Sequence, residues 1–598
     1  MIFAIATILL FLGLGLPFTF CLPNDLRDRT SVAPVLGLGL MGIAETIGYF
    51  HGLHNLVTLA AVLIATTSYG WALFHHQFRT SVATFSIFGA WLSAICLLPL
   101  LLYGFQDHLF YSNPTDKLNY ISIASGMGVR SFSELSNLAP TERSTPIIAA
   151  ATNLFARPTA PLLLTRLKWL FGYASAEAII PFEAVLQAIT AFGIYFFLRN
   201  SFLVNRPRSI FCATAFSIGF FSQYIVDIDA LSSLSALSFA PAALALIHRM
   251  ASTNSPPHLP VSVPLGLLVA AQLYFYPEAI PALLIPALGM SAIFLFAYPR
   301  RLVIIAHYGA SVAVAAILTF PIWQSTLSYL SFQAGVAQMV GAGWFLIFDK
   351  FFLGDVGLHD PPSFYKDLSI PINLAMGFIG LFFLAPPDWL PYAAKLVWKI
   401  AEGIFVMALF ATAFIHSTKQ RNAAIYISCL MSVALPLVLC VRGEAWAAGK
   451  AVTTISPIIF SALVFTIGTR RWISFPAIVL ASTSLIFGLQ RAILPTLLDD
   501  RKLALGYPLK VAELDRYSWD VSAWKKTLDG CKKIDLNVTN PYLSRLVETI
   551  ALDSGVPYDS SIDRLTYYGE GSTVMASPRD GSADCLITNQ TIGLQGER

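Results

Sequence analysis

Residues 1–22 read MIFAIATILLFLGLGLPFTFCL and residues 31–50 read SVAPVLGLGLMGIAETIGYF, two apolar runs separated by a short polar segment. Each is long enough to cross the hydrocarbon core of a bilayer as a helix, which takes about 20 residues. No basic segment precedes the first run and a second span follows it, so we predict a retained helix rather than a cleaved secretory signal. The opening of the chain therefore indicates a membrane protein.

The composition extends this prediction to most of the chain. Of the 598 residues, 56% are hydrophobic and only 12% are charged, whereas soluble proteins carry about 25% charged residues. The net charge of +4 includes no basic block, which argues against a nucleic-acid partner. Further spans are predicted at residues 55–75, 81–105, 179–198, 209–225, 231–247, 261–275, 279–297, 302–322, 372–385, 400–415, 423–440, 452–467 and 473–489.

The composition changes after residue 497. We predict an all-α polytopic membrane bundle over residues 1–497 and a small soluble C-terminal α/β domain over residues 498–598. The tail contains strand-like runs at 534–538 and 586–588 and a helix-like stretch at 543–552. It also contains Cys531 and Cys585, which form one disulfide if the tail lies in an oxidising compartment; two free thiols are the open alternative.

The positions of Lys and Arg predict the orientation, because short loops rich in these residues stay in the cytoplasm. This rule places the long loop 106–175, the turns at Asp227, Glu278 and Glu444, and the C-terminal domain outside the cytoplasm. A second loop is predicted at 324–370, and one crossing between residues 323 and 399 is left undecided. The predicted location is a bacterial inner (plasma) membrane.

No soluble-enzyme motif is present: the sequence contains no Gly-rich phosphate loop with Lys, no HExxH, no GxSxG and no paired CxxC. Candidate residues are therefore sought where spans meet water. Residues 106–120 read QDHLFYSNPTDKLNY, at the start of the long loop. A carboxylate at a helix end that is half surrounded by lipid has raised basicity and accepts a proton from a hydroxyl. The alternative is that Asp107 and His108 only mark the membrane boundary.

This layout resembles the GT-C superfamily of glycosyltransferases. The resemblance rests on a helix that ends in an aspartate, a long outside loop with two apolar, partly amphipathic stretches (146–157 and 162–172), a multi-helix bundle and a soluble outside tail. GT-C enzymes transfer a sugar from a polyprenyl phosphate or pyrophosphate donor. Two features depart from the superfamily: three helices precede the one that carries the aspartate, and the second carboxylate has no unambiguous counterpart. A divalent cation (Mg or Mn) is therefore left open.

The resemblance implies roles for residues of the long loop. Asp107 matches the general base that deprotonates the acceptor hydroxyl, so that the hydroxyl attacks the anomeric carbon with inversion. Asp116 would orient the acceptor or bind a cation; alternatively, it caps the helix that starts near Lys117. His108 and Tyr120 are predicted to line the substrate cavity. The acceptor would be a glycan, a lipid or a protein, as in polysaccharide biosynthesis of the cell envelope.

Other candidates lie in the turns between spans. Residues 441–450 read VRGEAWAAGK, in which Arg442 and Lys450 are predicted to bind the donor phosphate. A salt bridge to Glu444 or contact with lipid headgroups is the alternative for both. Glu444, and Glu278 in a Tyr-Pro-Glu break between two spans, are predicted to line the cavity. The metal candidates are Asp227 and Asp229, which are otherwise solvated turn residues.

Three other functions are compatible with many spans. A polymerase or ligase of surface polysaccharide needs the same base and the same phosphate-binding cations. A transporter or flippase of lipid-linked sugars typically has repeated halves and ionisable residues at mid-span. A scaffold without activity is the third. The charged residues of this sequence concentrate at the ends of the spans, which favours a site at the membrane surface.

Overall fold

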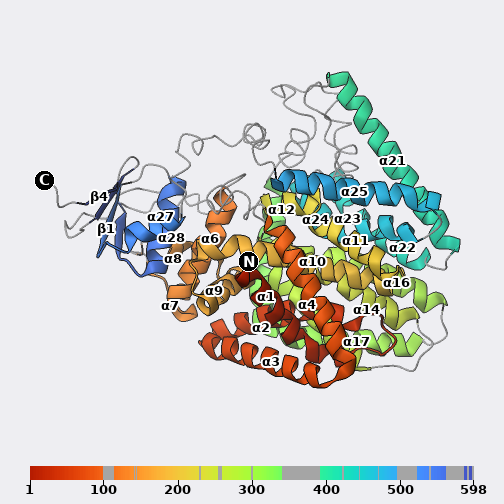
Figure 1. Cartoon of the computed structure of the whole chain (residues 1–598), viewed down its shortest axis with the longest axis horizontal. Helices are drawn as coiled ribbons and strands as arrows, with labels where there is room; N and C mark the ends of the chain where they lie inside the picture. Colours follow the sequence, from red (N-terminus) through yellow and green to blue (C-terminus); the bar gives the residue numbers. More distant parts are fainter. Residues whose placement is uncertain are drawn as a thin grey trace.

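The computed structural model describes residues 1–98, 114–139, 142, 144–227, 231–252, 259–297, 301–339, 391–419, 423–442, 445–468, 471–493, 521–537, 541–560, 585–588 and 592–594. Within these residues the chain is a helical bundle with a small sheet near its C-terminus (Figure 1). The predicted fold class is thereby confirmed. Asp107, His108, Asp229 and Glu444 lie outside the described residues, as do the predicted span 372–385, most of loop 324–370 and the undecided crossing.

The first part of the chain forms the N-terminal helices, the helices of the long loop, and a span of 26 residues. Their bounds are α1 (Ile2–Gly15), η1 (Leu16–Cys21), η2 (Arg29–Val32), α2 (Ala33–Phe50), α3 (His54–Phe74), α4 (His76–Cys96), α6 (Pro114–Val129), α7 (Phe132–Ser136), α8 (Thr145–Asn153), α9 (Thr159–Phe171) and α10 (Ser175–Asn200).

The second part completes the bundle. Its helices are α11 (Arg206–Ser217), α12 (Phe220–Asp227), α13 (Leu231–Ala236), α14 (Phe239–Ser252), η3 (Leu259–Val261), α15 (Ser262–Phe275), η4 (Pro277–Ala279), α16 (Ile280–Ala297), α17 (Arg301–Thr319), η5 (Phe320–Ile322), α18 (Trp323–Met339), α21 (Tyr392–Lys419), α22 (Ala423–Met431), α23 (Ala434–Val441), α24 (Ala445–Val464), η7 (Phe465–Gly468) and α25 (Arg471–Ile493).

Eight helices of the described part are long and apolar enough to cross a membrane, and several shorter apolar helices accompany them. The chain is therefore a multi-pass integral membrane protein. Three segments predicted as continuous spans, at 209–225, 231–247 and 423–440, are each two shorter helices. The predicted span 302–322 runs on through η5 into α18, which ends at Met339 within the region where one crossing was left undecided.

Helix α10 forms the centre of the bundle, since its most apolar 18-residue window is 100% buried. Helix α1 packs closely along α2 because glycines remove side chains from their contact. A Cβ atom at Gly15 would overlap the carbonyl of Ala33, and one at Gly37 would overlap the carbonyl of Phe11. Small residues permit such close contact between helices in a bilayer, where the hydrophobic effect does not drive helix association.

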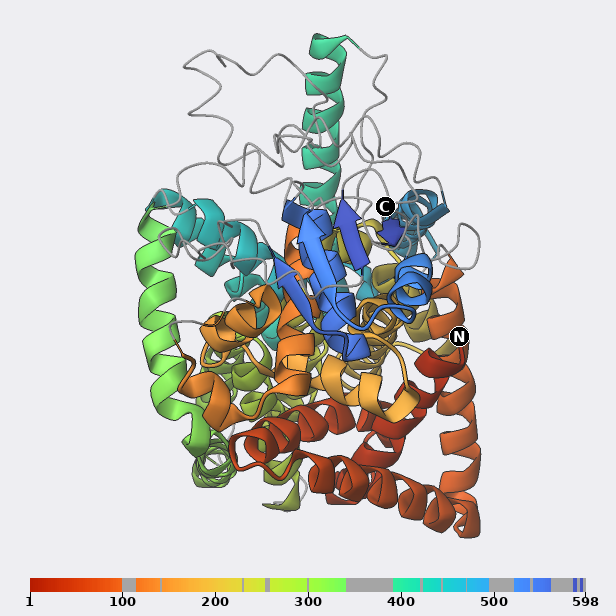
Figure 2. The same cartoon turned by 90° about the vertical axis from the view of Figure 1, so that its left-hand side faces the viewer.

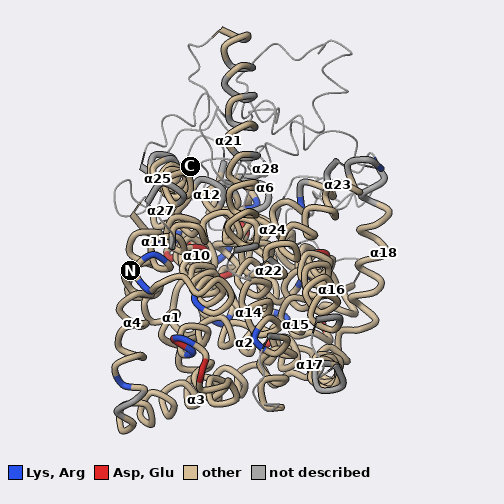
Figure 3. The backbone as a smooth tube through the Cα atoms, turned by 90° about the vertical axis from the view of Figure 1, so that its right-hand side faces the viewer, with Lys and Arg blue, Asp and Glu red and all other residues tan. Residues whose placement is uncertain are grey.

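The bundle has two distinct poles. At the first, called the basic pole, Arg27 donates from its backbone N–H to Asn200, Arg199 pairs with Asp28 at 2.8 Å, and Arg249 pairs with Asp25. Figure 3 is viewed from this side. The opposite pole, called the domain pole, carries α6 to α9 and the C-terminal domain, which Figure 2 shows in front of the bundle. The side of the membrane on which each pole lies stays a prediction.

The C-terminal domain contains α27 (Val521–Leu528), α28 (Pro541–Ser554) and a sheet of β1 (Ile534–Asn537), β2 (Tyr558–Ser560), β3 (Cys585–Thr588) and β4 (Ile592–Leu594). The strand order is β2-β1-β3-β4, with β1 parallel to β2 and β3, and β4 antiparallel to β3. Helix α28 is the crossover that parallel β1 and β2 require. A disulfide joins Cys531 to Cys585, as the first of the two sequence alternatives predicts.

Candidate functional site: a cation and tyrosine cluster at the domain pole

Two cations from distant parts of the chain meet one carboxylate at the domain pole. Oε1 of Glu278 lies 3.5 Å from Nζ of Lys450 and 3.6 Å from Nη1 of Arg157. The hydroxyl of Tyr329 donates a hydrogen bond of 2.8 Å to the same oxygen. Lys450 also donates to Oε1 of Gln333 at 3.3 Å. We call Arg157, Tyr276, Glu278, Tyr329 and Lys450 the cation–tyrosine cluster.

A backbone break places Glu278 in the cluster. Helix α15 ends at Phe275, Tyr276 is non-helical with φ −155° and ψ 77°, and Pro277 starts the short helix η4. Proline disfavours helical conformation in the residue before it, so the chain turns here between two apolar helices. Tyr329 and Gln333 lie four residues apart on α18 and share one face of that helix. Lys450 lies in α24 and Arg157 between α8 and α9.

Aromatic rings surround the guanidinium of Arg157. Its central carbon lies 5.3 Å from the ring centre of Tyr276 and 5.5 Å from that of Tyr329. Burial by itself lowers the pKa of Arg157, but interaction with Tyr329 and Glu278 raises it well above its ordinary value. The guanidinium is therefore charged at any physiological pH. Cation–π contacts stabilise such a partly buried charge without using its N–H donors.

The cluster brings together some of the residues predicted from sequence. Lys450 and Glu278 are in contact, although Glu444 was the carboxylate considered as a partner for Lys450. Tyr120 contributes to the electrostatic surroundings of Arg157, and its hydroxyl donates to Ser232 at 3.3 Å. Arg442 is exposed one residue after α23, and its predicted role stays a prediction.

Asp116 is not the residue that caps α6. The described part of this helix begins at Pro114, so Asp116 lies in its first turn rather than before it. Proline is favoured at the first position of a helix because its missing N–H has no helical partner there. The proposed role of Asp116 toward the acceptor is untested by this placement.

Sequence reasoning missed Arg157, Tyr329 and Gln333. Arg157 is the last residue of the predicted amphipathic stretch 146–157, where a lone cation carries no spacing signal. Tyr329 and Gln333 have the i, i+4 spacing of one helix face, which was available from the sequence. Neither signal indicates that these residues meet Glu278, because their contact depends on the packing of α18 against η4 and α24.

Three ion pairs among the described residues join the long loop to the bundle. Besides Arg157 with Glu278, Lys117 of α6 pairs with Glu183 of α10 at 3.3 Å. Arg166 of α9 pairs with Glu45 of α2 at 3.7 Å, and Glu45 also accepts from Thr58. In each pair the loop supplies the cation and a bundle segment supplies the carboxylate. A charge that is largely buried is costly without a partner, so the pairs fix the loop helices on the bundle.

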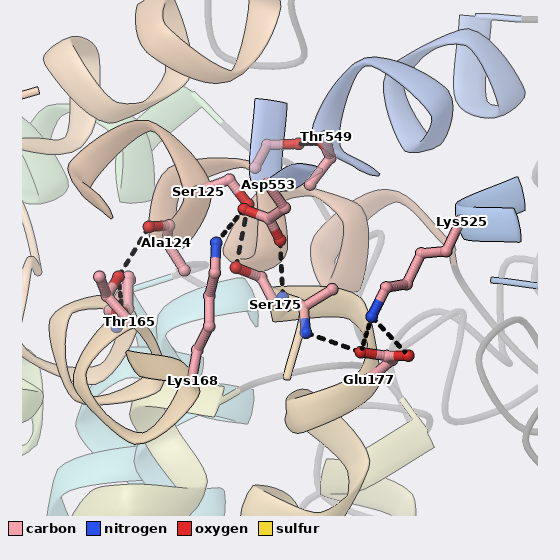
Figure 4. A network of polar contacts seen from close by, with 12 residues as sticks. Ala124, Ser125, Thr165, Lys168, Ser175, Glu177, Lys525, Thr549 and Asp553 are labelled. Carbon is pink, nitrogen blue, oxygen red and sulfur yellow. Dashed lines mark hydrogen bonds and ion pairs between the residues drawn. The ribbon is translucent and has the colours of Figure 1, made fainter. Parts of the chain in front are cut away.

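The C-terminal domain holds the same loop helices from the other side (Figure 4). Asp553 of α28 binds Nζ of Lys168 and accepts from the backbone N–H of Ser175 at 2.7 Å. Lys525 of α27 pairs with Glu177 at 3.0 Å. Arg545 of α28 donates to Asn119 and Ser122, both on α6. The domain thus contacts the helices that flank Arg157 and the helix that carries Lys117.

The residues described here contain no group of three or more His, Cys, Asp or Glu side chains that would hold a metal ion. Asp227 ends α12, and Asp229 and Asp107 lie outside the described residues. We therefore derive no step through a divalent cation.

Comparison with known proteins yields a similarity of fold. No protein family profile matches the chain, and no curated protein matches its sequence. The chain is similar to the crystal structure of the Archaeoglobus fulgidus oligosaccharyltransferase in complex with Zn and sulfate, with a TM-score of 0.38 and 12% sequence identity. The match covers 79% of this chain, which spans 62% of the length of that protein.

Proposed function

We propose that the chain is a membrane glycosyltransferase that moves a sugar from a polyprenyl-phosphate-linked donor to a glycan, lipid or protein acceptor. The observation that carries this proposal is the convergence of Arg157 and Lys450 beside Glu278, at the end of an apolar bundle. A donor of this class has an apolar tail that needs lipid and a phosphate that needs cations. Both requirements are met where the cluster adjoins the loop.

The chemistry follows from the leaving group. The acceptor hydroxyl attacks the anomeric carbon, the bond from that carbon to the phosphate oxygen breaks, and the phosphate departs with the bonding electrons. Arg157 and Lys450 stabilise the negative charge that develops on this oxygen. The proton of the hydroxyl passes to a carboxylate, for which Asp107 is the candidate.

The ion pairs favour an enzyme over a transporter. In a transporter, ionisable groups usually lie between two repeated halves of the bundle near mid-membrane. Here the pairs of Lys117, Arg157 and Arg166 each join the long loop to a carboxylate of the bundle. This arrangement supports a site between loop and bundle, at the membrane surface. A polysaccharide polymerase or ligase would use the same site and differs only in its acceptor.

The test is sugar transfer by the full-length protein in detergent from radiolabelled polyprenyl-linked donors. We expect transfer by the wild type and a loss of about 10²-fold or more in Lys450→Met, in line with loss of one group that stabilises a developing oxyanion. Lys526→Met, on the exposed face of α27, is the matched control and should keep full activity. The proposal is wrong if the wild type transfers sugar from none of these donors, or if Lys450→Met equals the control.

A further inference from the structure

We propose that the cation–tyrosine cluster selects donors with a single phosphodiester charge, and that Glu278 sets this selection. The donor is then a sugar linked to a polyprenyl monophosphate rather than to a polyprenyl diphosphate. The inference rests on the proposed function and goes beyond it by naming the donor class.

The first step is the charge of the cluster. Arg157 and Lys450 supply two positive charges, and Glu278, between them, supplies one negative charge. The side chain of Glu278 is only 13% exposed, and Pro277 and the hydrogen bond from Tyr329 restrict its movement. The five residues of the cluster therefore carry one net positive charge between them. A phosphodiester with one negative charge neutralises it.

The second step is the hydrogen-bonding capacity of Arg157. Among the residues that the structure describes, its guanidinium makes no hydrogen bond; its contacts are the ion pair at 3.6 Å and the two tyrosine rings. Because no described residue accepts a hydrogen bond from them, the N–H groups of the guanidinium can bind a ligand. Those groups match two oxygens of one phosphate, which is the geometry that guanidinium recognises best.

The third step is the effect of a second phosphate. A donor diphosphate brings a second negative charge, one oxygen bridge away from the first, and the cluster has no net positive charge left for it. Glu278 then faces an unpaired like charge in a site largely removed from water, where charges interact more strongly than in solution. Removing the charge of Glu278 should therefore improve diphosphate binding more than monophosphate binding.

The experiment measures binding, so that it does not depend on the sugar or the acceptor. The probes are farnesyl methyl phosphate, with one negative charge, and farnesyl methyl diphosphate, with two. Their dissociation constants are measured for the full chain in detergent. We expect the wild type to prefer the monophosphate by about tenfold or more, because juxtaposed like charges lower affinity by at least that much.

Variants of the cluster distinguish an effect of its net charge from an effect of its shape on donor binding. Glu278→Gln raises the net charge of the cluster and should shift the preference toward the diphosphate by about tenfold or more. The double variant Glu278→Gln/Lys450→Gln returns the net charge to one and should move the preference back toward the monophosphate. Glu134→Gln, the same substitution at an exposed site of α7, should leave it unchanged.

Failure of this inference is distinguishable from failure of the proposed function. If the wild type prefers the diphosphate, or if Glu278→Gln leaves the ratio of the two affinities unaltered, the selection by Glu278 is disproved while transfer activity still supports the proposed function. If the double variant behaves like Glu278→Gln, charge is not the cause of any shift and the inference is equally overturned. Binding of neither probe, together with absence of transfer, rejects the function itself.

Discussion

At the scale of single residues, Arg157 is the group whose chemistry is hardest to replace. Lysine keeps the positive charge but lacks the planar fork of donors of the guanidinium, whose central carbon lies near the rings of Tyr276 and Tyr329. We expect Arg157→Lys to weaken donor binding by about tenfold, the loss of one charge-assisted hydrogen bond. The measurement is the dissociation constant of a polyprenyl-linked donor. Arg130→Lys, at a more exposed arginine of the same loop, is the control; equal affinities of the two variants would show that only charge matters at Arg157.

Asp107 is the candidate base. Asparagine has its size but accepts no proton, so we expect Asp107→Asn to lower the transfer rate by on the order of 10²- to 10⁴-fold while donor binding is kept. If Asp107 only marks the membrane boundary, the rate stays unchanged, since asparagine is also stable there. The rate of transfer at saturating donor decides between the two. Asp529→Asn, exposed in the C-terminal domain, controls for the substitution.

The candidate residues show how far sequence alone leads. Glu278 was predicted because a Tyr-Pro-Glu break between apolar spans is costly unless it faces polar groups. Lys450 was predicted because it departs from the positive-inside rule. Both arguments are local. The meeting of these two residues with Arg157 joins segments that lie more than a hundred residues apart, and no local pattern encodes it.

At the scale of elements, hydropathy predicted where helices lie but not where they break. The predicted span 209–225 is α11 and α12, which separate at Ile218 and Gly219. A Cβ atom at Gly219 would overlap the carbonyl of Ala215, and one at Gly488 of α25 would overlap the carbonyl of Ile218. The break therefore comes with a close approach of α25. The apolar content of a sequence segment does not show that another helix packs against it, so hydropathy could not predict this break.

The contact of α28 with the long loop makes a prediction at this scale. Asp553 is 2% exposed and holds both Lys168 and the N–H of Ser175, so Asp553→Asn removes the charge that Lys168 needs. Loss of one partner of a buried pair costs about 3–5 kcal/mol, and partial exposure of Lys168 lowers this to about 2–4 kcal/mol. We expect faster amide hydrogen exchange in residues 541–554. Unchanged exchange, as expected for the exposed control Asp529→Asn, would mean that the pair does not stabilise the contact.

The disulfide stabilises the C-terminal domain. Cys531 and Cys585 are 54 residues apart in sequence, and closing a loop of that length restricts the unfolded chain by about 4 kcal/mol in the chain-entropy estimate. The bond links the residues before β1 to the start of β3. Reduction is therefore expected to destabilise the domain and to speed amide hydrogen exchange within it. The measurement is hydrogen exchange with and without reductant. Complete alkylation of both thiols in unreduced protein would contradict the bond.

At the scale of the whole molecule, cations gather at both poles. The basic pole gathers Arg27, Arg199 and Arg249, and the domain pole gathers the cation–tyrosine cluster and the docked C-terminal domain. The sequence rule assigns the basic pole to the cytoplasm. A polyprenyl-linked donor would then meet its acceptor on the opposite face, where the disulfide also persists. Orientation, donor site and redox state are consistent with one topology.

This topology leads to the last prediction. A reporter enzyme that is active only outside the cytoplasm, fused after Arg598, should be active, and the same reporter inserted after Asn205, between α10 and α11, should be inactive. The physical reason is that the segments at the basic pole carry Arg27, Arg199 and Arg249, and segments rich in arginine are translocated poorly. The opposite pair of results would reverse the predicted membrane topology. It would place Cys531 and Cys585 in a reducing compartment, where a structural disulfide is rare. It would also turn the site of Arg157 and Lys450 toward the cytoplasm, so the donor and acceptor would have to be sought there.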